Sequence, residues 1–402
     1  MQGKATFIVG LQYGDEGKGK IVDYLAEKSD VVIRGNGGAN AGHTIVQKDG
    51  QALALHQIPS GIVYKDVLNI IGNGCFLDPL RLTAEIVEAE SKGIKVSSEN
   101  LKISKSAHLV LPVHKQKDEK REKGGHSQGS TKSGIAFVAA DKYLREGIRA
   151  EAIGESTKDD LVKLGGAEFG EAAYAIANHL CDSVQLIQDS ISSGKKILVE
   201  GAQAFGLDIN HGKYPYVTSS DTTVSGLLSG SGLNHKQVGK VIGVAKAIPS
   251  KVGGGPFVTK IQDENIAAKS RGQKGKVDSE FGATTGRERE VGYLDLVVLK
   301  RAVEVNGVDE IALTKFDCLK RHGKTTMVAV AYEFKGKKIT SPPSSGVELY
   351  ECSPVYEELP TWTDNDSPEA KKYLKFIEDY LKVPVTMLGT GPNRKDLIVR
   401  GK

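Results

Sequence analysis

A glycine-rich segment that directly follows a short apolar run constrains this chain more than any other feature of its sequence. Residues 5–11 read ATFIVGL, and the segment 14–20, GDEGKGK, follows almost at once. Apolar residues between positions 21 and 26 then recur at helical spacing. Strand, glycine loop and helix in this order predict a phosphate site, because glycines let backbone N–H groups turn toward an anion at the positive end of a helix.

The loop also carries acids, which an ordinary phosphate loop lacks. Its spacing fits G-x-x-x-x-G-K, but Ile21 stands where that motif needs Ser or Thr to hold Mg²⁺, so a metal ligand must come from elsewhere. Asp15 and Glu16 would repel a triphosphate unless they bound a metal or took a proton from a substrate. Lys18 and Lys20 supply positive potential. We interpret the loop as a phosphate site with chemistry of its own; a plain turn with a solvated face is the alternative.

A second glycine-rich segment, 34–44 (RGNGGANAGHT), follows a predicted strand at 31–33. Loops that follow neighbouring parallel strands face each other across one crevice at the carboxyl edge of the sheet. His43 in the second loop would then meet a phosphoryl group held by the first. A structural role is the alternative for a histidine considered alone.

Composition excludes several classes of protein. The 402 residues are 39% hydrophobic and 26% charged, as in a soluble globular protein. No apolar run is long enough to cross a membrane, and the N-terminus lacks the features of a signal peptide, so we expect a cytoplasmic protein. The four cysteines form no C-x-x-C pair, and a net charge of +4 from 54 basic and 50 acidic residues does not suit a nucleic-acid binder.

Alternating strand and helix patterns predict an α/β fold with a large, mostly parallel central sheet flanked by helices and with loop and helical insertions. We expect strands at 52–56, 67–71, 196–200, 241–247, 309–313 and 383–388, helices at 79–91 and 368–381, a helical region at 158–195 and a hairpin at 326–340. Because segments with site chemistry run from residue 14 to 392, a single domain over 1–402 is expected. Residues 112–195 would form a polar loop plus a helical insertion, and 114–132 a surface loop.

Three later segments carry side chains that suit small anionic substrates. Gln203 and Thr218 offer an amide and a hydroxyl to a purine edge or a nucleotide phosphate. The segment 282–289, GATTGRER, presents arginine forks that clamp carboxylates. Asp317 at a strand end suits the N1–H and 2-amino groups of guanine, with the Lys315 stem on the ring, and this favours GTP over ATP. Each segment alone is also compatible with an ordinary turn.

Taken together, these segments resemble the adenylosuccinate synthetase family, whose members join IMP to L-aspartate and couple that step to GTP cleavage. The resemblance rests on QYGDEGKGK at 12–20 and GGANAGHT at 37–44, and EGAQ at 200–203, YPYVTSS at 214–220 and TKFD at 314–317 extend it. The chain departs from the family pattern at three positions. Ser133 stands where the family has arginine, and Glu288 and Glu290 stand where it often has basic residues.

The resemblance implies a site residue by residue. The implied catalytic residues are Asp15, His43 and Lys18. IMP would bind to Asn40, Thr131, Arg145, Gln203, Thr218 and Arg287, and aspartate to Thr285, Arg287, Arg289 and Val252. GTP would bind to Gly14, Glu16, Gly17, Lys18, Gly19, Gly42, Thr44, Lys315, Asp317, Gly389 and Gly391. One Mg²⁺ per subunit would be held by Asp15 and the Gly42 carbonyl, and a homodimer would let Arg145 reach the site of the other subunit.

The implied reaction has two steps. Asp15 would take the N1 proton of IMP so that O6 attacks the γ-phosphate of GTP, and the amine of aspartate would then displace phosphate from 6-phosphoryl-IMP. Lys18 would balance the charge of the transferring group, and His43 would donate to it. Other interpretations stay open at this point: a related GTP-dependent ligase for another purine nucleotide or amino acid, a regulatory GTPase, or a scaffold without chemistry.

Overall fold

The computed structural model describes residues 3–46, 50–124, 128–276, 279–281, 286 and 288–401. Within those residues, ten strands form one sheet in the order β10-β8-β6-β2-β11-β1-β12-β16-β20-β21. Every neighbouring pair is parallel except β20 and β21. The strands are β1 (Ala5–Gly10), β2 (Val31–Arg34), β6 (Leu68–Ile71), β8 (Leu101–Ser104), β10 (Leu180–Cys181), β11 (Ile197–Glu200), β12 (Val238–Lys246), β16 (Glu310–Thr314), β20 (Val385–Gly389) and β21 (Leu397–Val399). The predicted mostly parallel α/β sheet is confirmed.

Helices cover both faces of this sheet, which explains why its central strands are apolar almost throughout. Alternate residues of β1 face opposite sides: Ile8 belongs to a cluster with residues of α1, whereas Phe7 and Val9 pack with residues of α8, α9, α11 and α12. The helices are α1 (Lys18–Ala26), α2 (Pro79–Ser91), α3 (Pro112–Lys123), α4 (Ile135–Leu144), α5 (Glu151–Glu155), α6 (Lys158–Gly165), α7 (Ala167–Ala175), α8 (Ser183–Ser192), α9 (Val224–Ser231), α10 (Glu264–Arg271), α11 (Leu296–Asn306) and α12 (Pro368–Leu381).

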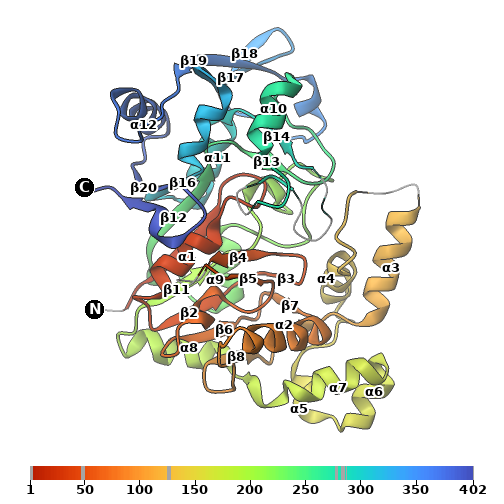
Figure 1. Ribbon diagram of the computed structural model, residues 1–402. Helices are drawn as coiled ribbons and strands as arrows, with labels where there is room; N and C mark the ends of the chain where they lie inside the picture. Colours follow the sequence, from red (N-terminus) through yellow and green to blue (C-terminus); the bar gives the residue numbers. More distant parts are fainter. Residues whose placement is uncertain are drawn as a thin grey trace.

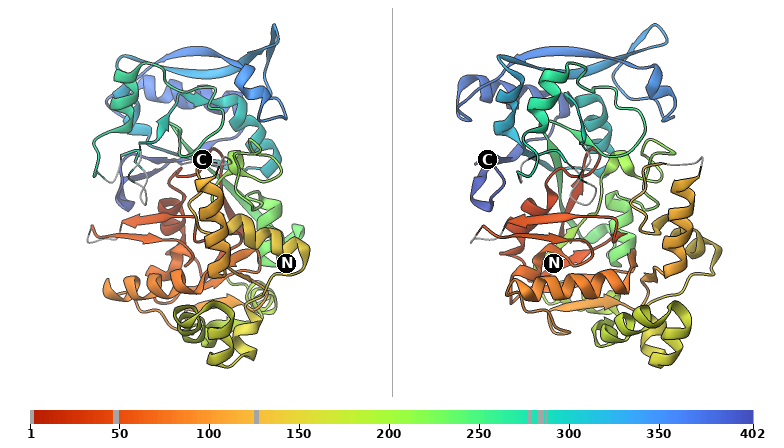
Figure 2. Two further views of the ribbon diagram at one scale, coloured as in Figure 1. Left: turned by 90° about the vertical axis from the view of Figure 1, so that its right-hand side faces the viewer. Right: turned by 45° about the vertical axis from the view of Figure 1, so that its right-hand side comes forward.

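Smaller sheets flank the large one (Figure 1). They comprise β3 (Gly37–Gly38), β7 (Cys75–Leu77) and β9 (His108–Leu109); β4 (His43–Val46) and β5 (Ala52–Leu55); β13 (Ser250–Lys251) and β14 (Glu290–Val291); and β15 (Leu294–Asp295), β17 (Thr325–Phe334), β18 (Lys337–Ile339) and β19 (Ser353–Pro360). The antiparallel pair β17–β18 confirms the predicted hairpin, whereas β19 was not predicted. The views of Figure 2 agree with Figure 1 in placing the sheet of β17–β19 at the end opposite to α5, α6 and α7.

Two of the helices predicted from the sequence, α2 and α12, begin with a side-chain cap. The Asp78 side chain caps α2 by accepting from the Arg81 backbone N–H, and Ser367 caps α12 in the same way, each directly before a proline at the first helical position. A side-chain oxygen at the cap satisfies one of the N–H groups that the first turn leaves free. The sequence therefore fixes the start of both helices.

The prediction of a surface loop at 114–132 was wrong in its first part, because residues 112–123 form α3. This helix has no apolar stripe, so hydrophobic periodicity carries no signal for it. Its Lys, Glu, Gln and Arg residues are nevertheless good helix formers, and Pro112 suits the first helical position. Figures 1 and 2 show α3 beside α4 at one side of the molecule, and the predicted helical insertion continues through α5–α8. The single domain over 1–402 stays a prediction.

In the part of the chain that the structure describes, none of the helices combines the length and the apolar character that spanning a bilayer requires.

The buried hydroxyl of Tyr373 offers a test of how this core is held. Tyr373 on α12 is 1% exposed and packs against Trp362, with ring centroids 5.1 Å apart. Its hydroxyl has no hydrogen-bond partner among the described residues, and burial raises its pKa above the usual range. Because a desolvated hydroxyl without a partner costs free energy, we expect Tyr373→Phe to raise the free energy of unfolding by about 1 kcal/mol. Chemical denaturation with unchanged m-value measures this.

Tyr332→Phe is the matched control. Tyr332 is equally buried, but its hydroxyl donates to the buried carboxylate of Asp295. Removing that donor leaves Asp295 short of a partner, so stability should fall by about 1–3 kcal/mol. Equal effects of the two substitutions would contradict the assignment of the Tyr373 hydroxyl as unpaired.

Candidate active site

The first glycine loop adopts a backbone that few residues tolerate. Gly14 and Gly17 have φ of 87° and 85°, and Asp15 between them has φ of 56°. Gly17 is the N-cap of α1 and lies in the left-handed region, where a side chain would be strained. Aspartate is among the few other residues that accept this region. The loop therefore turns sharply at three positions and delivers Lys18 to the first turn of the helix.

The two acids of the loop have different surroundings. Glu16 is fully buried and braces the loop from inside: its carboxylate accepts from the backbone N–H groups of Gln12 (3.2 Å) and Gly14 (2.8 Å), and Lys18 Nζ lies 2.7 Å from its other oxygen. The side chain of Asp15 is 42% exposed, and the residue lines a pocket. Asp15 is therefore the acid of this loop that is available to a ligand.

Lys20 was expected to add positive charge beside Lys18, but its ammonium group is bound to backbone carbonyls. Its Nζ donates to the carbonyls of Gly391 (2.8 Å) and Asp396 (3.0 Å) in the C-terminal turn. Two residues apart on a helix, Lys18 and Lys20 point about 200° apart, so their ammonium groups have different partners although both residues line the pocket. Burial lowers the pKa of Lys20 to about 8, although nearby acids oppose the shift. Lys20 therefore joins α1 to the C-terminal turn that contains Gly391, one of the residues predicted for GTP.

Asp15 is connected to the predicted guanine and aspartate residues through Glu280. Arg289 Nη2 lies 2.9 Å from the Asp15 carboxylate, and Arg289 Nη1 donates to Glu280 at 2.9 Å. Glu280 also accepts from Lys246 (3.0 Å) and from Lys315. Burial opposes the charge on Glu280, but Lys246, Lys315 and Arg289 outweigh it and hold its pKa well below the usual range. Glu280 is therefore a fixed anion that orients three cations.

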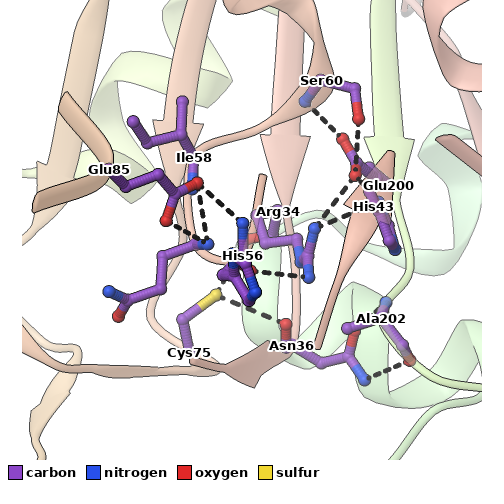
Figure 3. Close-up of polar contacts among 11 residues, drawn as sticks. Arg34, Asn36, His43, His56, Ile58, Ser60, Cys75, Glu85, Glu200 and Ala202 are labelled. Atoms are coloured by element: carbon purple, nitrogen blue, oxygen red, sulfur yellow. Dashed lines mark hydrogen bonds and ion pairs between the residues drawn. The ribbon is translucent and has the colours of Figure 1, made fainter. Parts of the chain in front are cut away.

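His43 belongs to a buried polar group at the ends of adjacent strands (Figure 3). Its Nδ1 contacts the carboxylate of Glu200, which Arg34 Nη1 also reaches at 2.9 Å. Burial, with help from the Arg34 guanidinium, lowers the pKa of His43 even though Glu200 opposes the shift. Burial likewise opposes the charge on Glu200, but His43 and Arg34 prevail and lower its pKa to about 2. Glu200 is therefore ionised next to His43.

Three residues predicted for IMP form one hydrogen-bonded set. Gln203 Nε2 donates to Asn40 Oδ1 at 3.1 Å, and Asn40 Nδ2 donates to Thr218 Oγ1 at 3.3 Å. The remaining amide oxygen of Gln203 is buried and has no partner among the described residues. A buried acceptor without a partner at the wall of a pocket is suited to a ligand donor.

The predicted guanine residues carry a comparable feature. Lys315 has φ of 54°, in the left-handed region, and Asp317 follows at the start of a short helical segment. Asp317 Oδ1 is buried and accepts no hydrogen bond from the described residues. This oxygen is therefore available to accept a hydrogen bond from a ligand. Recognition of guanine requires such an acceptor for its N1–H and 2-amino groups.

The departures from the family pattern do not place acids in the pocket. Glu288 pairs with Arg271 (3.5 Å), and Glu290 pairs with Lys260 (2.6 Å). Neither glutamate lines the pocket. Ser133 does line it, and its hydroxyl lies 2.9 Å from that of Thr131. The pocket therefore lacks one arginine of the family pattern but gains no carboxylate from these positions.

A pocket of about 1710 Å³ unites these residues. This volume exceeds that of a typical single-ligand site, about 300–1,000 Å³, and is suited to several substrates at once. Of the predicted site residues, the lining includes Gly14, Asp15, Glu16, Gly17, Lys18, Gly19, Asn40, Gly42, His43, Thr44, Thr131, Gln203, Thr218, Val252, Arg289, Lys315, Asp317, Gly389 and Gly391. Arg145 does not line it, and Thr285 and Arg287 lie outside the described residues.

The residues of the pocket could bind Mg²⁺ only together with the phosphate groups of a substrate. Among the described residues, no group of three or more His, Cys, Asp or Glu side chains forms a cage. Mg²⁺ is usually held by one or two carboxylates together with substrate phosphates and waters. Asp15 and Gly42, which both line the pocket near the phosphate loop, supply one carboxylate and one carbonyl. That donor set fits a phosphate-bound Mg²⁺.

Sequence reasoning missed Glu200 and Glu280 as parts of the site. Glu200 was interpreted only as the end of a strand, and Glu280 was not considered. Both are buried carboxylates that contact candidate site residues: Glu200 contacts His43, and Glu280 contacts Arg289. One signal was available for Glu200: an acid that ends an otherwise apolar strand, ILVE, next to a glycine. For Glu280 the local sequence offers no such signal.

Comparisons with known proteins agree on one family. A family model described as adenylosuccinate synthetase matches residues 7–168 and 162–398. The adenylosuccinate synthetase of Caldicellulosiruptor bescii is 44% identical, over 98% of this chain and 98% of the relative, and that of Chlorobaculum tepidum is 40% identical over 98% and 97%. The chain thus matches nearly the whole length of both relatives.

A solved structure is similar over its whole length. The fully ligated adenylosuccinate synthetase of Plasmodium falciparum superposes with a TM-score of 0.90 at 35% identity, covering 99% of this chain and 100% of that one. Succinoaminodeoxyadenylate synthetase of cyanophage S-2L superposes with a TM-score of 0.67 at 23% identity, covering 100% and 97%. The second likeness concerns the fold alone.

Proposed function

The chain belongs to the adenylosuccinate synthetase family, and from this premise we propose how its own residues perform the family's reaction. It is a GTP-dependent ligase that joins IMP and L-aspartate. The observation that carries the assignment of roles is the contrast between Asp15 and Glu16: one carboxylate of the loop is open to the pocket and the other is buried in the loop's own hydrogen bonds.

In our proposal Asp15 is the general base that removes the N1 proton of IMP. The proton moves to the Asp15 carboxylate, the electron pair moves through the ring to O6, and O6 attacks the γ-phosphorus of GTP with GDP as the leaving group. The 6-phosphoryl-IMP so formed has a good leaving group at C6. The amine of aspartate then displaces phosphate, and the overall reaction gives adenylosuccinate, GDP and phosphate.

The transferring phosphoryl group needs charge neutralisation more than covalent help. Lys18, 4% exposed in the first turn of α1, would balance its charge, and His43 at the pocket wall would donate to it. A bound Mg²⁺, held by Asp15 and the Gly42 carbonyl, would neutralise the phosphate oxygens. The Gln203, Asn40 and Thr218 set would hold IMP, and Asp317 with Lys315 would hold guanine.

Arg289 would change partners when aspartate binds. Its guanidinium lies between the carboxylates of Asp15 and Glu280, so its positive charge neutralises the proposed base. A carboxylate of the incoming amino acid competes for the same guanidinium. We propose Arg289, Val252, Thr285 and Arg287 for the aspartate site. Movement of Arg289 would release Asp15 toward IMP.

The assembly and compartment are further parts of the proposal. Tyr143 and Leu144, 81% and 61% exposed at the end of α4, adjoin Arg145, and exposed apolar groups beside a basic residue suit a protein interface. We propose a homodimer in which Arg145 reaches the IMP of the partner site, in a cytoplasmic protein folded as one domain over 1–402. A sedimentation mass equal to one chain would contradict the dimer.

Phosphate release in a coupled assay tests the function. We expect release only when GTP, IMP, L-aspartate and Mg²⁺ are all present, with a product whose mass equals that of adenylosuccinate. Replacing IMP with GMP, aspartate with glutamate, or GTP with ATP should lower kcat/KM by at least about a hundredfold, or about 2.7 kcal/mol. Phosphate release without IMP would instead indicate a simple GTPase, and faster turnover with another amino acid would indicate a related ligase.

A further inference from the structure

We propose that Glu200 is a positioning residue for His43: its buried carboxylate holds the Nδ1 side of the imidazole and so presents Nε2 to the phosphoryl group in the pocket. This inference rests on the proposed function in one respect, the role of His43 at the transferring phosphoryl group. It adds a residue that neither the glycine loops nor the predicted nucleotide contacts include.

The sheet brings the members of this group together. Glu200 ends β11 and Arg34 ends β2, and these adjacent parallel strands pair with Glu200 opposite Arg34. Paired residues on neighbouring strands project from the same face, so the register itself places the guanidinium beside the carboxylate. His43 begins β4 and is one of the residues that line the pocket, whereas Glu200 and Arg34 do not line it. The carboxylate therefore lies behind His43 as seen from the pocket. Figure 3 shows Glu200 between Ser60 and Arg34, with the hydrogen bonds that join them.

Glu200 has no freedom to turn away from His43. Ser60, in a short helical segment, donates its backbone N–H to Oε2 (2.8 Å) and its hydroxyl to Oε1 (3.0 Å). Arg34 Nη1 donates to Oε1 at 2.9 Å and its Nη2 to the His56 carbonyl at 3.1 Å. With His43 Nδ1, three of these groups contact Oε1 and one contacts Oε2, so rotating the carboxylate would break several contacts at once. The orientation of the carboxylate is therefore fixed by groups outside the pocket.

The contacts also select one tautomer of His43. An ionised carboxylate only accepts, so the Nδ1 atom against Glu200 must carry a proton and donate. Arg34 Nη1 lies 3.3 Å from the same nitrogen, but a guanidinium only donates and cannot bond to a protonated Nδ1. Both groups donate to Glu200 instead. With Nδ1–H fixed, Nε2 is the nitrogen left for the phosphoryl group, and it donates there only when the ring is the imidazolium, in which both nitrogens carry a proton.

Glu200→Gln tests the proposal, because the amide keeps the shape but offers Nδ1 either a donor or an acceptor. We expect kcat to fall by about a hundredfold, the size of a general acid–base contribution, while KM for GTP and IMP stays within about threefold. Ser60→Ala removes a donor to Glu200 without touching His43 and should lower kcat by less than about threefold. A kcat for Glu200→Gln within about threefold of the parent enzyme would overturn the proposal.

The double variant separates this inference from the role of His43. If Glu200 acts through His43, Glu200→Gln should add less than about threefold to the loss caused by His43→Gln. Multiplicative losses would overturn the positioning role and leave the proposed function intact. A His43→Gln variant with full activity would instead remove the role of His43 from the proposed function, and the positioning role with it.

Nitrogen-15 NMR of the histidine-labelled wild-type protein gives a readout that does not depend on a variant folding. The His43 signals, assigned by their absence in His43→Gln, should show a protonated Nδ1. In Glu200→Gln, if it folds, the same ring should show a mixture of tautomers. A wild-type His43 whose neutral ring carries its proton on Nε2 would overturn the proposal.

Discussion

Replacing Asp15 with asparagine should lower kcat by about a thousandfold or more, within the range of a general base, while GTP affinity changes by less than about fivefold. An amide does not take the N1 proton of IMP, so O6 does not become nucleophilic. GTP binding draws on the loop backbone, Lys18, Lys315 and Asp317, none of which the substitution touches. Phosphate release with all substrates present measures kcat, and calorimetric titration with GTP measures binding.

Asparagine is the appropriate replacement because of the backbone at position 15. With φ of 56°, alanine there would add about 1–2 kcal/mol of strain, whereas asparagine accepts the left-handed region. Its amide oxygen also remains an acceptor for Arg289, which lies 2.9 Å from Asp15. Turnover within about tenfold of the parent enzyme, or about 1.4 kcal/mol of barrier, would rule out Asp15 as the base.

A magnesium titration separates the two roles proposed for Asp15. If its main role were to hold Mg²⁺, saturating metal would restore much of the activity of Asp15→Asn by mass action. If it is the base, the loss in kcat persists at saturating Mg²⁺. We expect the loss to persist, because proton removal has no substitute in a pocket whose other loop carboxylate, Glu16, is buried and paired.

The sequence predicted the parts of this structure that depend on local chemistry. The strand, loop and helix at 5–26 follow from composition and helical spacing, and the helices predicted at 79–91 and 368–381 are observed with those bounds. The predicted nucleotide-site residues that the structure describes all line one pocket apart from Arg145, because the loops that carry most of them follow parallel strands of a single sheet.

Features that depend on contacts between distant segments were not predictable from a single sequence. His43 and Glu200 lie 157 positions apart, and their contact follows from strand order and register, which no local pattern encodes. The same holds for Arg289 and Asp15, which are far apart in the sequence. Helix α3 was not predicted for another reason. It has few apolar side chains, so its polar sequence was interpreted as a loop. It is joined to the 128–134 segment by Asp118, which accepts from Ser130 and Gly134.

Lys18→Met should reduce both activity and stability strongly. Lys18 and Glu16 form a buried pair, 4% and 0% exposed, with Nζ 2.7 Å from the carboxylate. Removing the lysine leaves an unpaired buried carboxylate next to the phosphate site, which should lower the free energy of unfolding by about 3–5 kcal/mol. It also removes a charge aimed at the transferring phosphoryl group, worth about 10²–10³ in kcat. Chemical denaturation and the phosphate assay measure the two losses.

The double variant Glu16→Gln/Lys18→Met separates these two effects. Removing both charges should restore most of the stability lost in Lys18→Met, because replacing a whole buried pair by neutral groups is far less costly than breaking it. A glutamine at position 16 still offers an amide oxygen to the backbone N–H groups of Gln12 and Gly14, so the loop keeps its shape. Activity should nevertheless remain at least about a hundredfold below the parent enzyme, because no cation faces the phosphoryl group from this helix turn. If the double variant regained turnover to within about tenfold, Lys18 would serve only to neutralise Glu16, and the positive charge that phosphoryl transfer requires would have to come from another residue of the pocket.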